Sequence, residues 1–285
     1  MARKLRHRRH RPLPARLFSA AVTCAAMAYL LAIVGLPVGT LFYEAFAEGW
    51  DAFVAALRDE NTQHALWLTV KVCAIVVPIN TLFGLAAAWV LARQRFVGHG
   101  ALAAFVNLPM ALAPTIAGLL IVLVYSPTLG LLAGPVEASG WQIVFAPPAM
   151  VIATLLVTLP LVALELLPTL EQLEVAEEQA AITLGANAWQ TFFRVILPAV
   201  RWSLVYGIVL CTAKAAGEFG AVSAVSGKTI GETMTLTLHV EQAYTDYETV
   251  KAYASSTVLT LLSVGTLILH LILPSQHRSA PATNE

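Results

Sequence analysis

Long uncharged apolar runs constrain this chain more than any other feature of its sequence. The first run, from Leu17 to Tyr43, contains no Asp, Glu, Lys or Arg. A helix of about 20 apolar residues is long enough to cross the hydrocarbon core of a bilayer. Similar runs recur along the chain, and we expect six membrane spans, over residues 17–43, 64–92, 101–125, 144–168, 199–218 and 251–273.

Each of these spans is predicted to be a helix. Lipid offers no partner for backbone N–H and C=O groups, so a spanning segment must satisfy them internally. The alternating ten-residue pattern of a transmembrane barrel is absent from the sequence. Only 12% of the residues are charged, against about 25% in soluble domains. The sequence therefore predicts an all-α integral membrane protein with six transmembrane helices.

The distribution of basic residues predicts the orientation of these helices. Residues 1–16 contain seven of the 17 Lys and Arg and no acid, whereas segment 44–63 contains one basic residue, Arg58, among five acids. Segment 93–100 is basic again, and segment 126–143 has no Lys or Arg. Because Lys and Arg concentrate in cytoplasmic loops, we expect both chain termini to be cytoplasmic.

This topology divides the chain into four segments. The basic arm is followed at once by a span, so we expect it to stay in the cytoplasm and not to bind nucleic acid. The predicted segments are a cytoplasmic arm 1–16, a first transmembrane helix with an external segment 17–63, a core of five transmembrane helices 64–273 containing a cytoplasmic loop 171–198, and a cytoplasmic tail 274–285.

No metal-binding or nucleotide-hydrolysing motif is found in the sequence. Cys24, Cys73 and Cys211 lie in apolar stretches without metal-site spacing, and we expect no bound metal. Residues 226–229, Ser-Gly-Lys-Thr, resemble the end of a phosphate-binding loop, but Val222 occupies the position of its first glycine. Topology also places this segment outside the cell. We therefore expect that the chain cannot hydrolyse ATP by itself.

The cytoplasmic loop contains a segment suited to docking. Residues 177–184 favour a helix, Ala180 and Ala181 permit close approach of another surface, and Gly185 can end the helix in a left-handed conformation. An apolar face follows, and Pro198 begins the next span. The pattern indicates a short helix-turn-helix along the membrane, either a docking element or an ordinary interfacial loop.

The spacing of this segment resembles the cytoplasmic EAA loop of ABC importer permeases, E-A-A-x-x-x-G followed by about nine residues and I-x-L-P. Two positions depart from that pattern, since Gln179 replaces the usual Glu and Val195 the usual Ile. Glu178, one residue upstream, is expected to replace part of the missing charge. The resemblance implies an ATPase-coupling loop that comprises Glu178, Gln179, Ala180, Ala181, Gly185, Leu197 and Pro198.

A second polar segment lies where the fifth span ends. Lys214 and Glu218 are four residues apart and share a helix face. Ionisable groups at membrane depth usually face a cavity or one another, so the pair either lines an anion path or is structural. Lys71, the other cation within a span, is expected to extend to the outer surface. The candidate anion pathway comprises Lys214, Gly217, Glu218, Gly220 and Ser223.

Residues 217–223, Gly-Glu-Phe-Gly-Ala-Val-Ser, resemble the signature of sulfate/thiosulfate importer permeases. The segments that follow resemble the W-type permease subunit of that system, through Gly231-Glu-Thr, Thr237-Leu-His-Val-Glu241 and Tyr244 with Asp246-Tyr247. The resemblance covers residues 60–273. It implies a type I importer permease fold in the bacterial inner membrane, without a cofactor of its own, that imports sulfate or thiosulfate by alternating access. The implied partners are a cytoplasmic ABC ATPase dimer that uses ATP and Mg, a second homologous permease subunit, a periplasmic sulfate-binding protein and the lipid bilayer.

Three alternatives remain at this point. Molybdate-type oxyanion permeases share the Gly-Glu-Phe-Gly-Ala sequence but usually diverge just after it. A secondary anion transporter would show paired repeats with interrupted helices, and no convincing repeat is present. An integral membrane enzyme would need a cluster of titratable groups at one depth, where the sequence offers only Lys214 and Glu218.

Overall fold

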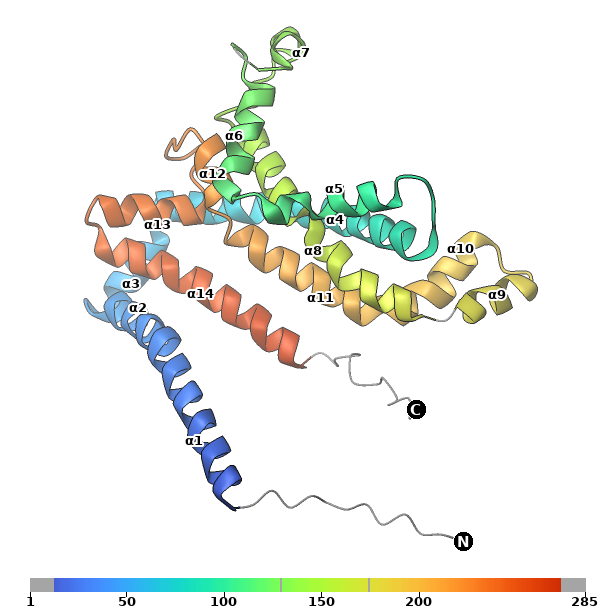
Figure 1. Ribbon diagram of the computed structural model, residues 1–285. Coiled ribbons are helices and arrows are strands. Elements are labelled where there is room, and N and C mark those ends of the chain that lie inside the picture. The colour runs from blue at the N-terminus through green and yellow to red at the C-terminus, as the bar shows by residue number, and fades with distance from the viewer. Residues whose placement is uncertain (1–12, 129, 174, 273–285) are drawn as a thin grey trace.

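The computed structural model describes residues 13–128, 130–173 and 175–272, and all regular structure among them is helical (Figure 1). Five of these helices are long and apolar enough to cross a membrane, or six if one bent pair is counted as a span. The predicted all-α membrane fold is confirmed. Most of the basic arm 1–16 and the whole tail 274–285 lie outside the described residues, so the expectations for them stay predictions.

The first span is helical, and only its final part packs on the remaining helices. It comprises α1 (Leu13–Leu30), a π-helical turn η1 (Leu31–Gly35) and α2 (Leu36–Phe46). Pro37 has no N–H to give to the preceding turn, and the wide turn lies just before it. In Figure 1, α1 extends away from the body, while α2 packs on α14 (Thr249–Ile272).

Three long helices form the centre of the molecule. They are α4 (Glu60–Arg93), α8 (Pro147–Gln172) and α11 (Leu197–Ala216), which pack against one another. Glycines allow the close approach: a Cβ added to Gly84 would lie 2.7 Å from Val162 Cβ, and one added to Gly207 would lie 3.1 Å from Val162 Cα. Small residues at crossings are typical of membrane helices because packing replaces the hydrophobic effect there.

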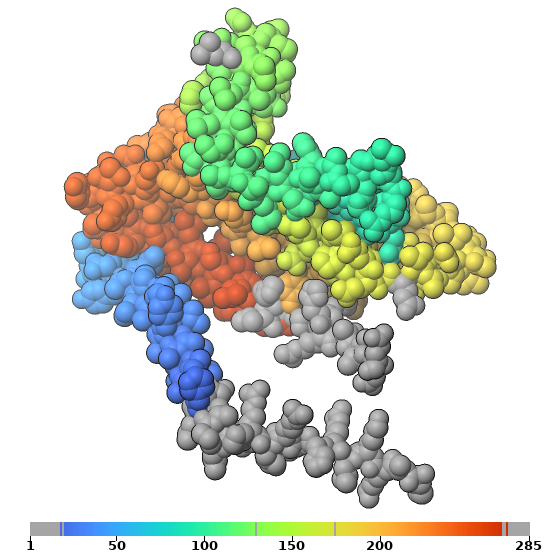
Figure 2. Space-filling view, viewed as in Figure 1, coloured from blue at the N-terminus to red at the C-terminus, as the bar shows by residue number. Residues whose placement is uncertain are grey.

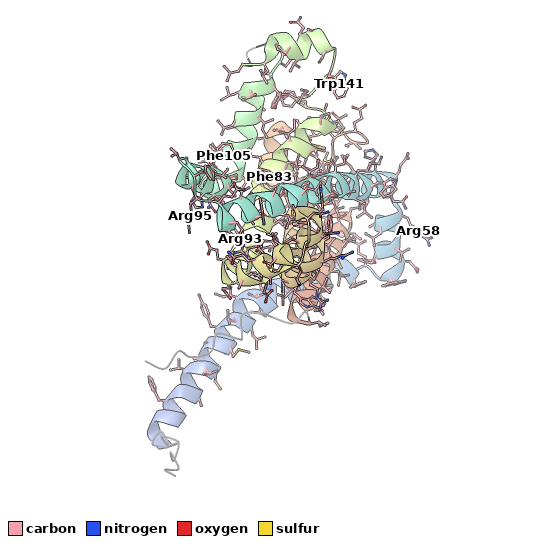
Figure 3. The ribbon with its side chains drawn as sticks, turned by 90° about the vertical axis from the view of Figure 1, so that its right-hand side faces the viewer. Arg58, Phe83, Arg93, Arg95, Phe105 and Trp141 are labelled. Atoms are coloured by element: carbon pink, nitrogen blue, oxygen red, sulfur yellow. The ribbon has the colours of Figure 1, made fainter. Side chains whose placement is uncertain are left out.

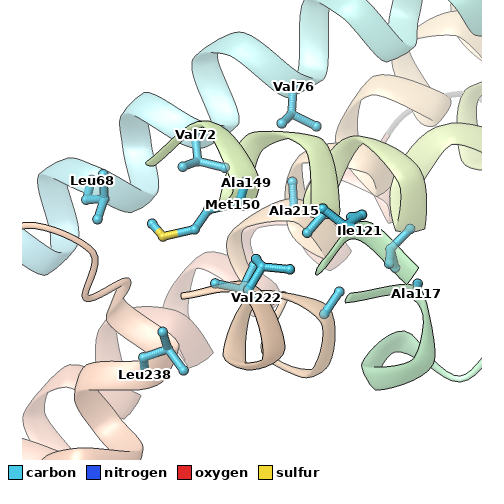
Figure 4. Close-up of a cluster of buried hydrophobic side chains, with 14 of the residues drawn as sticks. Leu68, Val72, Val76, Ala117, Ile121, Ala149, Met150, Ala215, Val222 and Leu238 are labelled. Carbon is cyan, nitrogen blue, oxygen red and sulfur yellow. The ribbon is translucent and has the colours of Figure 1, made fainter. Parts of the chain in front are cut away.

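The buried side chains form separate apolar clusters along these helices. Figure 4 shows the cluster nearer the end of the molecule where α4 begins, in which Leu68, Val72 and Val76 of α4 are buried together with Met150 of α8. Another cluster lies toward the opposite end and includes Leu166 and Leu170. Between them, Asn80 Nδ2 donates hydrogen bonds to Thr158 Oγ1 at 2.7 Å and to the Leu155 carbonyl at 3.2 Å. This buried polar contact joins α4 to α8 within the membrane.

The prediction of one continuous helix over 101–125 is wrong. The segment forms α5 (His99–Ala111) and α6 (Pro114–Tyr125), which are bent by 109°. Ala113, the residue before Pro114, is extended, as the proline ring requires. With 12 residues, α6 is about 18 Å long. It projects with α7 (Ala133–Ser139) away from the body (Figure 2).

Short helices close the end of the core where α4 begins, which is the end predicted to be external. Asp59 caps α4 by accepting a hydrogen bond from Thr62 N, after the amphipathic helix α3 (Trp50–Arg58). Beyond α11 follow α12 (Gly220–Val225) and α13 (Leu236–Thr245). The start of α13 is attached to α4, because Leu236 N donates to Thr69 Oγ1 at 2.9 Å.

Candidate coupling loop and anion pathway

Loop 171–198 forms the helix-turn-helix that its sequence predicts. Its first helix is α9 (Val175–Thr183), and Gly185 follows it with φ +87°. The N–H of Gly185 donates to the Ile182 carbonyl at 2.9 Å, and that of Ala186 to the Ala181 carbonyl at 3.0 Å. These bonds satisfy carbonyls at the helix end, and the left-handed backbone that makes them possible favours glycine.

The second helix of the loop continues directly into the next span. Asn187 caps α10 (Ala188–Thr191) through reciprocal hydrogen bonds with Gln190. A π-helical turn η2 (Phe192–Ile196) then leads into α11 without a break. Pro198 therefore lies inside a continuous helical run and does not begin a separate helix, which corrects the expected boundary. The wide turn just before it again accompanies a residue that cannot donate a backbone hydrogen bond.

The loop lies at one extremity of the molecule and presents apolar side chains to its surroundings. None of the residues of α9 is buried, and Gln179 and Ala180 are exposed. Leu184 is 88% exposed and Trp189 72%. In Figure 1, α9 and α10 stand at the right-hand edge, away from the packed centre. Exposed apolar groups gathered in this way indicate a surface for another protein.

Glu178 is not available as a free replacement for the charge missing at Gln179. Its Oε1 lies 2.6 Å from Arg93 Nη2 and accepts a hydrogen bond from Arg93 Nε at 2.8 Å. The two side chains are 14% and 11% exposed. Figure 3 looks onto this end of the molecule, where Arg93 is labelled. The sequence identified Arg93 only as one of the basic residues of segment 93–100, because nothing in the spacing links it to Glu178.

The two ionisable residues of the candidate anion pathway face each other as predicted. Lys214 lies in the last turn of α11, and its Nζ is 3.3 Å from Glu218 Oε2. The Lys214 side chain is 46% exposed, whereas that of Glu218 is 1% exposed. The other carboxylate oxygen of Glu218 accepts a hydrogen bond from Ala221 N at 3.0 Å. Glu218 thus stabilises the start of α12, and Lys214 carries the accessible charge.

The glycine-rich turn brings two helices into close contact. A Cβ on Gly220 would lie 2.9 Å from Pro114 Cβ, and one on Gly118 would lie 2.5 Å from the Ala221 carbonyl oxygen. These glycines allow α12 to pack on α6. Ser223 Oγ donates to the Gly220 carbonyl at 3.0 Å, and Gly217 ends α11. Of the five predicted pathway residues, Lys214 is the one whose charged group is accessible, because its side chain is 46% exposed and that of Glu218 is 1% exposed.

The segment that resembles a phosphate-binding loop has a different structure. Lys228 has φ +50° and pairs with Glu241 Oε2 at 2.8 Å on the surface. Residues 226–229 have no regular structure, residues 230–233 form turns, and the next helix, α13, begins only at Leu236. A phosphate-binding loop opens a helix whose N-terminus faces the phosphates, so this segment lacks the required context.

Comparison with known proteins relates the chain to membrane transport components. The family model described as "Binding-protein-dependent transport system inner membrane component" matches residues 80–276. A "Sulfate transport system permease protein CysW" of Synechocystis sp. is 48% identical over 248 residues, covering 87% of this chain and 90% of the relative. The protein of the same name in Escherichia coli is 42% identical, covering 85% and 82%.

Solved structures share the arrangement of helices at low sequence identity. A bacterial alginate ABC transporter in complex with an alginate pentasaccharide-bound periplasmic protein has a chain that matches with a TM-score of 0.75 and 16% identity. The match covers 93% of this chain and 96% of that chain. At this identity the likeness concerns the fold, and it supports the fold class expected from the sequence.

Proposed function

This chain belongs to the family of binding-protein-dependent transport system inner membrane components, and from that membership we propose that it is a permease subunit of an ATP-driven sulfate importer. The observation that carries the substrate is the 48% identity to a sulfate permease across most of both chains. Residues 217–223 lie within the matched region and form the turn at the Lys214–Glu218 pair.

In this proposal the chain conducts the anion and a separate ATPase supplies the energy. The exposed apolar side chains of α9 and α10 are the docking surface for one subunit of a cytoplasmic ATPase dimer, which uses ATP and Mg. A second homologous permease subunit completes the path, and a periplasmic sulfate-binding protein delivers the anion. Import is directional because the two states of the transporter differ in affinity for the anion.

Lys214 is the residue that we assign to the anion in the pathway. Its ammonium group is held by the buried Glu218 carboxylate and remains 46% exposed. A cation placed in this way compensates part of the charge of a passing oxyanion, which would otherwise be costly at membrane depth. Gly217, Gly220 and Ser223 support it indirectly, by shaping the turn between α11 and α12.

Reconstitution tests the proposal directly. The chain is purified with an ATPase subunit, a second permease and a sulfate-binding protein from the same source, and inserted into vesicles. We expect uptake of radiolabelled sulfate that requires ATP and the binding protein. Competition with thiosulfate and molybdate defines the range of anions. Uptake at full speed without the ATPase would contradict the proposal, and so would uptake of molybdate with no uptake of sulfate.

A further inference from the structure

The coupling helix α9 is held to this chain by few contacts. None of its residues is buried, and its main packing is on α10 and η2. An element with so little buried surface has little resistance to displacement. If a partner ATPase displaces α9, a further contact between α9 and the packed helices is needed for the displacement to reach them efficiently.

The Arg93 guanidinium group provides such a connection. Arg93 is the last residue of α4, and its Nε and Nη2 both contact Glu178 Oε1 in the first turn of α9. Its Nη2 also donates to the Leu173 carbonyl at 3.2 Å. Leu173 is the C-terminal cap of α8. One side chain thus joins the ends of three helices.

The low exposure of this ion pair distinguishes it from the surface pairs of the chain. Arg93 and Glu178 are 11% and 14% exposed, whereas Lys228 and Glu241 are 43% and 42% exposed. Exposed pairs contribute little to stability because water screens them. Separating a shielded pair leaves an uncompensated charge, which is costly, so the Arg93–Glu178 contact resists being pulled apart.

The helix at the receiving end extends through the whole core. From Arg93, α4 packs along α8 and α11 and reaches the external end, where Thr69 contacts the start of α13. We infer that the Arg93–Glu178 ion pair is a positioning contact that passes movement of the coupling helix directly to α4. This route runs beside the covalent one through α10 and α11, and the inference rests on the proposed function.

The test compares coupling efficiency in variants of the reconstituted importer. Arg93→Gln and Glu178→Gln each remove one partner, and the double variant Arg93→Glu/Glu178→Arg restores the pair in reverse. Arg95→Gln and Glu177→Gln are matched controls, because these neighbouring residues have the same charges and are exposed. The measured quantities are co-purification of the ATPase and the number of sulfate ions imported per ATP hydrolysed.

We expect each single variant to retain the ATPase and to import about tenfold fewer sulfate ions per ATP. The reversed pair should recover most of the loss, and the controls should match the wild type. Unchanged ratios in both single variants would overturn the inference. Loss of the ATPase from both single variants would also overturn it, because the pair would then serve docking and not transmission.

The failure of the inference can be told from the failure of the proposed function. The number of sulfate ions imported per ATP is compared with that of the wild-type complex. If only the inference is wrong, the wild-type complex imports sulfate and the single variants import as many sulfate ions per ATP as it does. If the wild-type complex shows no ATP-dependent uptake of sulfate, the proposed function is wrong and the inference falls with it.

Discussion

At the scale of single residues, the backbone of Gly185 leads to a prediction about coupling. Its φ of +87° is strongly disfavoured for a β-branched residue. We expect Gly185→Val to leave the protein inserted in the membrane but to reduce ATP-driven sulfate uptake severely, since the turn that positions α9 is lost. Uptake in vesicles and co-purification of the ATPase measure the two properties.

A matched variant separates the backbone effect from the added volume. Asn tolerates the left-handed region better than other residues with a side chain, so Gly185→Asn should retain most of the uptake. Apart from the two neighbouring residues, no atom lies within 4 Å of a Cβ added at Gly185, so the expected effect of Val comes from the backbone conformation. Wild-type uptake by Gly185→Val, with normal ATPase binding, would contradict the prediction.

Lys214 leads to a second prediction at this scale. Replacing it by Ala removes the accessible cation but also leaves the Glu218 carboxylate, which is 1% exposed, without its ion pair. The double variant Lys214→Ala/Glu218→Gln removes that second effect. We expect both variants to lower the rate of sulfate transport more than they lower ATPase binding, and Lys228→Ala at the surface pair to do neither. Unchanged transport kinetics in the double variant would remove Lys214 from the path.

His239 makes the stability of the external end dependent on pH. Burial lowers the pKa of His239 below its usual value of about 6.5, although the Asp59 and Glu248 carboxylates nearby oppose this and Lys251 adds to it. The ring contacts Thr62 Oγ1 at 3.0 Å. The folded protein thus binds fewer protons than the unfolded chain just below pH 6.5, so stability falls as the pH falls through this range.

The measurement is thermal unfolding in detergent from about pH 7.5 to about pH 5.5, an interval around the ordinary pKa of a histidine side chain. The wild type should lose stability toward the acid end, and His239→Gln should show a smaller loss over the same interval. His99, whose ring nitrogen contacts the Leu91 carbonyl at the opposite end of α4, offers a control substitution. Equal pH dependence of the wild type and His239→Gln would contradict the assignment to His239.

At the scale of helices, the contact of α4 with α8 depends on the absence of a side chain at Gly84. A Cβ there would lie 2.7 Å from Val162 Cβ and 2.9 Å from Ala163 N, so Gly84→Val must push the two helices apart. We expect a loss of about 1–3 kcal/mol of stability, measured as a lower unfolding temperature in detergent. Gly39→Val in α2 is the control, because no atom lies within 4 Å of its added Cβ.

The sequence predicts the helices well where one physical requirement determines them. The uncharged run from Leu17 and the Gly185 turn both take the expected structure, because membrane length and a left-handed backbone each leave few solutions. The break between α5 and α6 was not predicted. The sequence has Pro109 and Pro114 in this segment, but proline is tolerated within membrane helices. Proline alone therefore does not distinguish a kink from a bend of 109°.

The candidate sites show the same limit. The i, i+4 spacing of Lys214 and Glu218 was sufficient to place them together, because a helix determines that neighbourhood. The partner of Glu178 was not predictable, because Arg93 is 85 residues away in the chain and the packing of α4 beside α8 brings them together. The capping role of Glu218 at α12 was missed for a related reason, since the short helix has no strong signal in the sequence.

At the scale of the whole molecule, the chain has a packed centre and two projections. The centre is formed by α4, α8 and α11, while α1 with η1 and α6 with α7 extend from it (Figures 1 and 2). The projecting helices carry exposed apolar side chains, such as Leu31 at 66% and Leu123 at 61%. This distribution fits a subunit that is surrounded by lipid and partner proteins.

The interlocked glycines of α6 and α12 have one further consequence. With Gly118 against Ala221 and Gly220 against Pro114, neither helix can rotate without displacing the other. The projection formed by α6 and α7 is therefore expected to move together with the turn beside Lys214. A fluorescent reporter on the exposed Leu123 would therefore register movement of the turn beside the Lys214–Glu218 pair, at a position outside the candidate anion pathway.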